Sequence, residues 1–434
     1  MDERSYSTSV TEPYGVVVRS GEGEEITNLQ SCITITPPGT WICTWTRAST
    51  EGAADQSVVA ARSKDQGRTW SDPVVVEGPI DGPRIASCIL PFTVPHTGRI
   101  YAFFWWSTDP DPVRDAGHIY MRYSDDDGLT WSRRYPPWSR RYPLPRPRHA
   151  AIDEEGHQMH GWSYGVPKIM PNGEVVFTFA KIRPSSITPW LRAAEQIARR
   201  TGNPAELHNK VWHTHAFLMV GRNLLAEPDP QKLEFAVLPE GDAGLHVRMP
   251  SGVPTGDELS VEALSNGDWL GTLRTPLGCI YFATSSDEGR TWTQPQPMRF
   301  CPGGPIIPHP CSSQPLVRLA DGRFVLLFHN NAGDAHGGVG PWDKARVRTP
   351  LWALVGRELP RRTTGQRIVW GKPRIIVDNH IDFSESPLPC RTEINYPQLI
   401  EWAGRCFVCY CDRKRDVLIN EVAPALLDDF GLPV

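Results

Sequence analysis

Short apolar or alternating runs recur along the 434-residue chain and determine the fold that it is expected to adopt. Each run is rich in β-branched and aromatic residues and is bounded by Gly, Pro, Asp or Asn, as is typical of strands joined by turns. The runs begin at Ser57, Arg99, His118, Glu174, Trp269, Cys279, Phe324 and Cys406. We therefore expect a predominantly β protein.

One segment has the signals of a helix instead. Thr188 and Pro189 precede the run WLRAAEQIARR, and Thr201-Gly202 follows it. A capping threonine, a proline at the first helical position and a terminal glycine predict a helix near 188–201, inserted between strands. The 42 prolines and 37 glycines are spread along the whole chain without a linker, so residues 1–434 are expected to form a single domain.

An eight-residue repeat is the most specific feature of the sequence. Ser63-Lys-Asp65-Gln-Gly67-Arg-Thr69-Trp70 has counterparts at 124–131 and 285–292, and all three follow the pattern Ser-x-Asp-x-Gly-x-Thr-Trp. Each copy comes directly after an apolar run. In a tight hairpin, the Ser and Asp side chains bond the amides of the turn, Gly supplies the positive φ, and Trp packs beneath.

These repeats resemble the Asp boxes of the sialidase superfamily, also called the bacterial neuraminidase repeat family. The resemblance implies an all-β fold, a six-bladed β-propeller, with the boxes on outer hairpins where their role is structural. Trp370 is a candidate remnant of a further box.

The resemblance extends to segments that carry catalytic residues in the family. It implies that Glu258 activates a nucleophile, that Arg274 and Arg348 bind the substrate carboxylate, and that Tyr396 is the nucleophile. A neutral tyrosine suits a keto-acid sugar, because the carboxylate beside the anomeric centre would repel an anionic nucleophile. Arginine binds such a carboxylate as a bidentate fork. The leading interpretation is a retaining, sialidase-like exo-glycosidase that hydrolyses a terminal acidic sugar.

Two parts of the family pattern are less clear in this chain. The family takes its general acid from the loop before the first Asp box, where Asp55 is the nearest match and Glu51 the second. A third clamp arginine on the first strand is missing, because Asn28-Leu-Gln30-Ser-Cys32 stands in that region. Arg47 and Arg84 are candidates to replace it from neighbouring loops.

Histidines in the middle of the chain support two other interpretations. His157, His160, Trp162, His213 and His215 lie in one stretch, and His160 and Trp162 are candidate substrate contacts. A polysaccharide lyase uses histidine and tyrosine to take a proton from beside a uronate carboxylate and protonate the leaving group. A propeller that binds glycans without catalysis is a third possibility. The histidine pairs lack a third ligand at fixed spacing, so no metal or cofactor is expected.

Composition and charge limit the binding partners and the cellular location that are expected for the protein. The net charge is −4 and no basic tract is present, which argues against a nucleic-acid partner. No stretch approaches the roughly 18 apolar residues of a membrane span, and the first residues lack a signal-peptide pattern, so a cytoplasmic protein is expected. Cys406, Cys409 and Cys411 alternate with apolar residues and are expected to be small strand residues rather than zinc ligands. The oligomeric state stays open.

Overall fold

The computed structural model describes most of the chain. The described residues are 12–20, 26–51, 53–78, 85–107, 118–135, 160–162, 165–182, 214–241, 243–249, 254–334, 347–360, 365–380 and 393–428. The predicted helix near 188–201 lies outside them. Within them the helical element is the short 3₁₀ helix η1 (Pro424–Leu426), and no helix is long and apolar enough to span a membrane.

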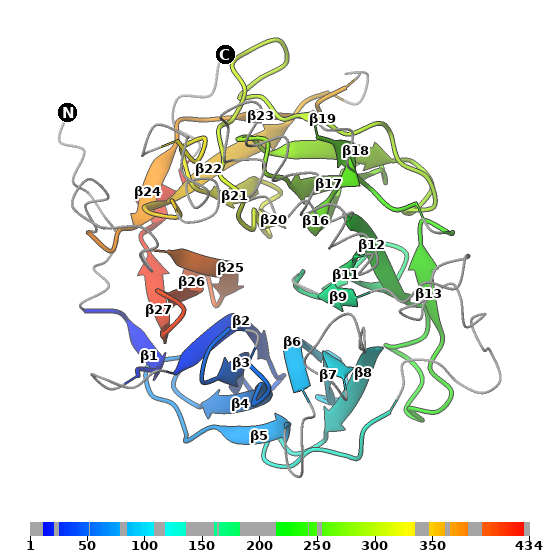
Figure 1. Ribbon diagram of the computed structural model, residues 1–434, viewed down its shortest axis with the longest axis vertical. Coiled ribbons are helices and arrows are strands. Elements are labelled where there is room, and N and C mark those ends of the chain that lie inside the picture. The colour runs from blue at the N-terminus through cyan, green and yellow to red at the C-terminus, as the bar shows by residue number, and fades with distance from the viewer. Residues whose placement is uncertain are drawn as a thin grey trace, which may run out of the picture.

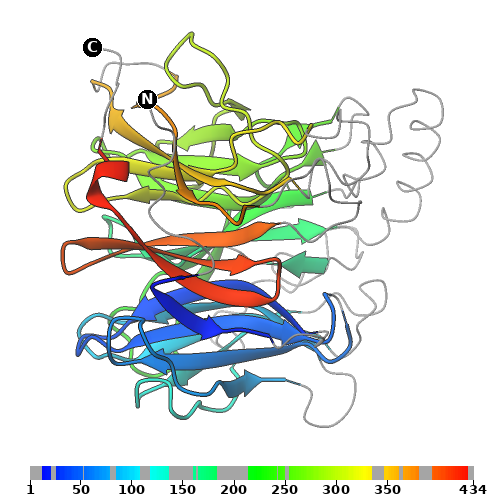
Figure 2. The ribbon, with the colours of Figure 1, turned by 90° about the vertical axis from the view of Figure 1, so that its left-hand side faces the viewer.

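Six antiparallel sheets stand around a central axis, as Figure 1 shows face-on and Figure 2 from the side. The expected six-bladed β-propeller is therefore confirmed. Blade 1 contains β2 (Thr27–Ile35), β3 (Trp41–Ala48), β4 (Ser57–Ser63) and β5 (Val74–Glu77), and blade 2 contains β6 (Ile85–Thr93), β7 (Ile100–Ser107) and β8 (His118–Ser124). Blade 3 contains β9 (His160–Trp162), β10 (Lys168–Ile169), β11 (Val175–Ile182), β12 (Thr214–Gly221) and β13 (Phe235–Leu238).

The second half of the chain forms the other three blades. A ribbon of β14 (Val247–Arg248) and β15 (Pro254–Thr255) precedes blade 4, which contains β16 (Asp257–Ala263), β17 (Trp269–Arg274), β18 (Tyr281–Ser285) and β19 (Gln296–Pro297). Blade 5 contains β20 (Leu316–Arg318), β21 (Phe324–Phe328), β22 (Leu351–Glu358), β23 (Ile368–Trp370) and β24 (Arg374–Val377). Blade 6 contains β25 (Ile394–Trp402), β26 (Arg405–Asp412), β27 (Asp416–Val422) and the N-terminal strand β1 (Gly15–Val18). Because β1 pairs with β27, the first strand of the chain completes the last blade and closes the ring.

Apolar side chains fill the space between neighbouring blades. The described residues form a buried cluster at each of the junctions, for example between blades 6 and 1, where Trp41 and Trp45 pack with Phe407 and Tyr396. Each predicted apolar run forms a strand of these blades. Cys409 and Cys411 are buried in β26 as expected, and the described cysteines are not disulfide-bonded.

The three repeats form hairpins with the same hydrogen bonds in blades 1, 2 and 4. In the first, Ser63 Oγ donates to Asp65 at 2.7 Å and accepts from the Gly67 amide at 2.8 Å. Asp65 also accepts from the amide and hydroxyl of Thr69, at 2.9 and 2.6 Å. Partial desolvation raises the pKa of Asp65, but the bonds from Thr69 and Ser63 outweigh it and lower that pKa to about 2. The repeats are therefore structural hairpins. Trp370 lies after the corresponding hairpin of blade 5 and is buried.

Candidate active site

A bulge recurs at the same place in the innermost strand of four blades. The pairing register shifts between Leu29 and Cys32, Ser87 and Leu90, Asp257 and Ser260, and Asn395 and Gln398. The first bulged residue has positive φ in each strand: Gln30 (57°), Cys88 (56°), Glu258 (39°) and Tyr396 (52°). Non-glycine residues rarely adopt this conformation, and bulges and strain of this kind concentrate at functional sites. The four bulged strands, β2, β6, β16 and β25, are the strands next to the axis of the ring (Figure 1).

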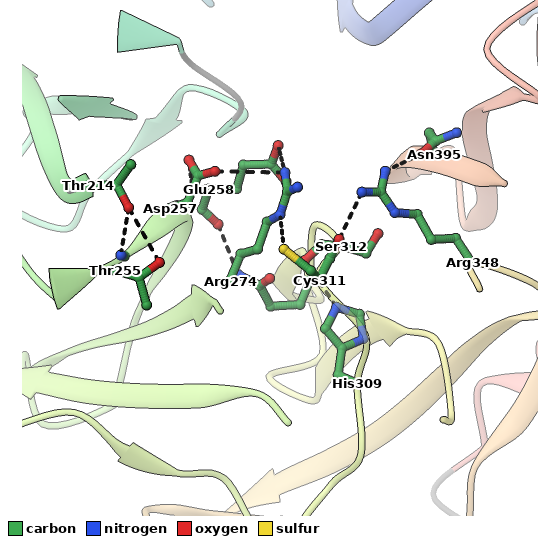
Figure 3. Close-up of polar contacts among 12 residues, drawn as sticks. Thr214, Thr255, Asp257, Glu258, Arg274, His309, Cys311, Ser312, Arg348 and Asn395 are labelled. Atoms are coloured by element: carbon green, nitrogen blue, oxygen red, sulfur yellow. Dashed lines mark hydrogen bonds and ion pairs between the residues drawn. The ribbon is translucent and has the colours of Figure 1, made fainter. Parts of the chain in front are cut away.

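Glu258 and Arg274 meet on adjacent strands of blade 4 (Figure 3). Arg274 pairs with Asp257 in the ladder, and its Nη1 donates to Glu258 Oε1 at 2.5 Å. Gln314, which precedes β20 of blade 5, donates to the carbonyl of Glu258 at 2.8 Å. The Gly256 amide bonds Thr214 Oγ1 at 3.1 Å, which ties the start of β16 to blade 3. The bulge that presents Glu258 is therefore held from both neighbouring blades.

Arg348 lies between blades 5 and 6, and its side chain is buried. Its Nη1 donates to Asn395 Oδ1 at 2.5 Å, and its Nη2 donates to the carbonyl of Cys311 at 2.8 Å. Arg274 Nε reaches the same residue at its sulfur, 3.4 Å away, so Cys311 stands between the two guanidinium groups (Figure 3). Arg274 and Arg348 therefore contact the same turn from two blades, and two neighbouring guanidinium groups form the charge pattern that binds a carboxylate.

Tyr396 is buried, and both acidic and basic side chains of the site act on its hydroxyl. Burial raises the pKa of Tyr396 well above its usual range, the carboxylates of Glu258 and Glu51 raise it further, and the two arginines oppose them. The phenol is therefore neutral at ordinary pH. Glu258 Oε2 is buried and, among the described residues, has no hydrogen-bond partner. A carboxylate oxygen in that state is suited to accept a proton.

Two buried histidines support the turn that contacts the arginines. His309 Nε2 bonds the carbonyl of Ser312 at 3.1 Å, and His309 Nδ1 accepts from the amide of His329 at 3.1 Å. His329 Nδ1 in turn bonds the carbonyl of Pro350, close to Arg348, at 3.0 Å. Burial lowers the pKa of His309 to about 3, so its ring stays neutral and keeps both bonds.

Glu51 and Asp55, the two candidates for the general acid, have different surroundings in the loop between β3 and β4. Asp55 accepts bonds from the amide and hydroxyl of Ser49 at 3.0 and 3.1 Å, which closes the loop on itself. Glu51 bonds Lys414 Nζ at 2.6 Å, from the β26–β27 hairpin, and its charge acts on Tyr396. Of the two candidates, Glu51 is the one whose charge is among the main causes that raise the pKa of Tyr396.

The structure does not show the remaining candidates from the sequence in contact with this site. Arg47 is exposed on β3, opposite Asn28, and Arg84 lies outside the described residues. His160 and Trp162 belong to β9, the strand of blade 3 next to the axis in Figure 1, but their side chains are outside the described part. His215 is buried in β12, and its ring lies against that of His246, tilted by 57° with 4.4 Å between ring centroids.

Comparison with known proteins identifies the fold. No protein-family model matches the sequence, and no curated protein matches it either. Among solved structures, an intramolecular trans-sialidase from leech in complex with 2,7-anhydro-Neu5Ac is similar with a TM-score of 0.61 and 13% identity, over 96% of this chain and 71% of that one. The chain therefore has the same six-bladed propeller fold as this trans-sialidase.

Two further solved structures match over nearly the full length of both chains. The intramolecular trans-sialidase of Ruminococcus gnavus, in complex with oseltamivir carboxylate, has a TM-score of 0.61 and 13% identity, over 95% of this chain and 98% of that one. A protein of unknown function from Dyadobacter fermentans has a TM-score of 0.60 and 15% identity, over 96% and 99%.

Several residues that complete the site were not candidates from the sequence. They are Cys88, Cys311, Asn395 and Lys414. Asn395 precedes Tyr396, and this adjacency is a signal that could have found it. The other three are brought in by packing between blades, which no local pattern records.

Proposed function

We propose that the chain is a retaining, sialidase-type glycoside hydrolase that acts on a terminal sugar with a carboxylate beside its anomeric carbon. The observation that carries this proposal is the meeting of Glu258, Arg274, Arg348 and Tyr396 at one end of blades 4, 5 and 6. A sialidase-like fold supports it.

Each group has one task in the proposed reaction. Arg274 and Arg348 bind the carboxylate and hold the anomeric carbon over Tyr396. Glu258 Oε2 takes the proton of the Tyr396 hydroxyl as its oxygen attacks, and the leaving oxygen receives a proton from the carboxylic acid form of Glu51. In the second step the Glu51 carboxylate takes a proton from water, and the water oxygen attacks the anomeric carbon. The bond to Tyr396 then breaks, and the phenol regains its proton from Glu258. Two displacements restore the original anomeric configuration.

Hydrolysis of aryl glycosides of keto-acid sugars and of uronic acids tests the proposal. We expect release from a keto-acid sugar, a loss in kcat of more than about 10³-fold in Tyr396→Phe, and a loss of about 10²- to 10⁴-fold in Glu258→Gln. Tyr410→Phe, at a buried tyrosine of the same sheet, and Glu262→Gln, on the same strand as Glu258 and paired with Lys168, are the matched controls. They should retain activity.

Failure to release any sugar from this panel would overturn the proposal. The same protein should then be mixed with uronate polysaccharides while ultraviolet absorbance is recorded. An increase from an unsaturated uronate product would establish the lyase instead, and saturable binding without any product would establish a glycan-binding propeller.

A further inference from the structure

Gln30 occupies in blade 1 the place that Glu258 occupies in blade 4. In each strand the last ladder pair before the bulge is followed by a residue of positive φ: Leu29 pairs with Thr46, and Asp257 pairs with Arg274. The partner residue across the ladder then holds the bulged side chain in both blades. Arg274 donates to Glu258 Oε1 at 2.5 Å, and Thr46 Oγ1 donates to Gln30 Oε1 at 3.3 Å.

This equivalence places each bulged side chain against its ladder partner, Thr46 for Gln30 and Arg274 for Glu258. Gln30 is 8% exposed, and the Thr46 hydroxyl that bonds it also accepts from the amide of Cys88 in blade 2, at 2.9 Å. On its other side stands blade 6, where Tyr396 packs in one cluster with Leu29. Gln30 therefore lies between the bulge of blade 2 and that of blade 6.

The bond to Thr46 determines which end of the amide remains for a ligand. Gln30 Oε1 is used as an acceptor, while in the described part of the chain no acceptor bonds the Nε2 group. Gln30 Nε2 is not among the buried side-chain atoms that lack a hydrogen-bond partner, so it keeps access to solvent, where a ligand can supply the acceptor. The group is uncharged, so it donates a hydrogen bond without adding a third cation to Arg274 and Arg348.

We propose that Gln30 is a specificity-determining residue that donates its amide N–H to a neutral oxygen of the bound sugar. This inference rests on the proposed function. The ligand class it selects is a sugar with one carboxylate, held by the two arginines, and an uncharged hydroxyl or carbonyl group on the side of blade 1. A second anionic group on that side meets no cation from Gln30 and is disfavoured.

Isosteric substitutions test the contact with whichever aryl glycoside the enzyme hydrolyses. Gln30→Met removes the donor and is expected to raise KM by about 3- to 10-fold, the cost of a neutral hydrogen bond. Gln30→Glu replaces the donor with an anion near the substrate carboxylate, so KM should rise by more than about 10-fold. Gln296→Met and Gln296→Glu, on the exposed edge strand β19, should stay within about twofold of wild type. Values within twofold for both Gln30 variants would overturn the proposal.

Thiol labelling separates the failure of this inference from the failure of the proposed function. We expect Gln30→Cys to be alkylated by iodoacetamide and to be protected by the hydrolysed sugar, as measured by peptide mass spectrometry. Gln398→Cys should stay unlabelled in the folded protein, because both ends of the Gln398 amide bond the backbone of Ile33 between the blades. No labelling at position 30 overturns the inference even in an active enzyme. Labelling in a protein that hydrolyses nothing overturns the proposed function, and with it the role of Gln30 in specificity.

Discussion

Glu51 and Asp55 are neighbours in one loop, yet their partners predict different roles. Asp55 bonds Ser49 within the loop, whereas Glu51 reaches Lys414 and acts on Tyr396. Protonation of the leaving group matters most when that group is a poor one. We therefore expect Glu51→Gln to lower kcat by about 10²-fold or more on an alkyl glycoside and much less on a nitrophenyl glycoside. Asp55→Asn should reduce both substrates equally and slightly.

Steady-state kinetics on the two substrates measures this difference, and Lys414→Met provides a check. Removing Lys414 leaves the Glu51 carboxylate in place, so the variant should retain a leaving-group dependence closer to wild type than Glu51→Gln does. If Asp55→Asn showed the strong leaving-group dependence instead, the proton donor would be Asp55, as the sequence suggested first.

At this scale the sequence predicts identities better than contacts. Tyr396, Glu258, Arg274 and Arg348 were candidates from their motifs, and the structure places them together. The turn at Cys311 was not, because its contacts with the arginines depend on how blades 4, 5 and 6 pack.

The Asp-box hairpins are the elements that the sequence predicts most fully, and their glycines differ in a testable way. Gly128 and Gly289 have φ values of 77° and 83°, so alanine is strained at both. A Cβ at Gly128 would lie 3.4 Å from Ile42, an ordinary contact, but one at Gly289 would lie 2.7 Å from Leu218 and 3.0 Å from Trp269. We expect Gly128→Ala to lower the free energy of unfolding by about 1 kcal/mol and Gly289→Ala by about 2–4 kcal/mol.

Urea unfolding with a third variant measures the two contributions. Gly267 has a φ of 90°, and a Cβ added there would meet open space, so Gly267→Ala measures the backbone strain alone. Equal losses at Gly267 and Gly289 would show that packing beneath the third box does not contribute.

The strands next to the axis are the elements that alternation finds least well. A bulge breaks the two-residue period, and it does so in β2, β6, β16 and β25. The second and third strands of the blades, which contain the predicted apolar runs, read clearly because the extra residues of the bulges lie outside them. The local pattern therefore fails at the strands that carry the site. The same bulges that interrupt the alternation also present the side chains of the site.

For the whole molecule, three boxes and a chain of this length indicated a propeller, but not how its ring closes. β1 pairs with β27, and Tyr14 beside it lies 5.1 Å from Phe407 between ring centroids. Arg68 of the first Asp-box hairpin stands over the same tyrosine at 4.8 Å. Tyr14 therefore links the edges of blades 6 and 1. No sequence motif predicts this contact between the two ends of the chain.

This closure should support both stability and the site, because the site spans it. Glu51 lies in blade 1 and Tyr396 in blade 6, on opposite sides of the junction. A Cβ at Gly15 would lie 1.8 Å from the carbonyl oxygen of Gly67, so Gly15→Ala must push β1 away from the first Asp-box hairpin. We expect a loss of about 1–3 kcal/mol in unfolding free energy and a fall in kcat while the protein is still folded. Gly173→Ala, with positive φ but open space, is the control, and a Gly15→Ala variant that lost stability but kept wild-type kcat would show that β1 closes the fold without holding the site.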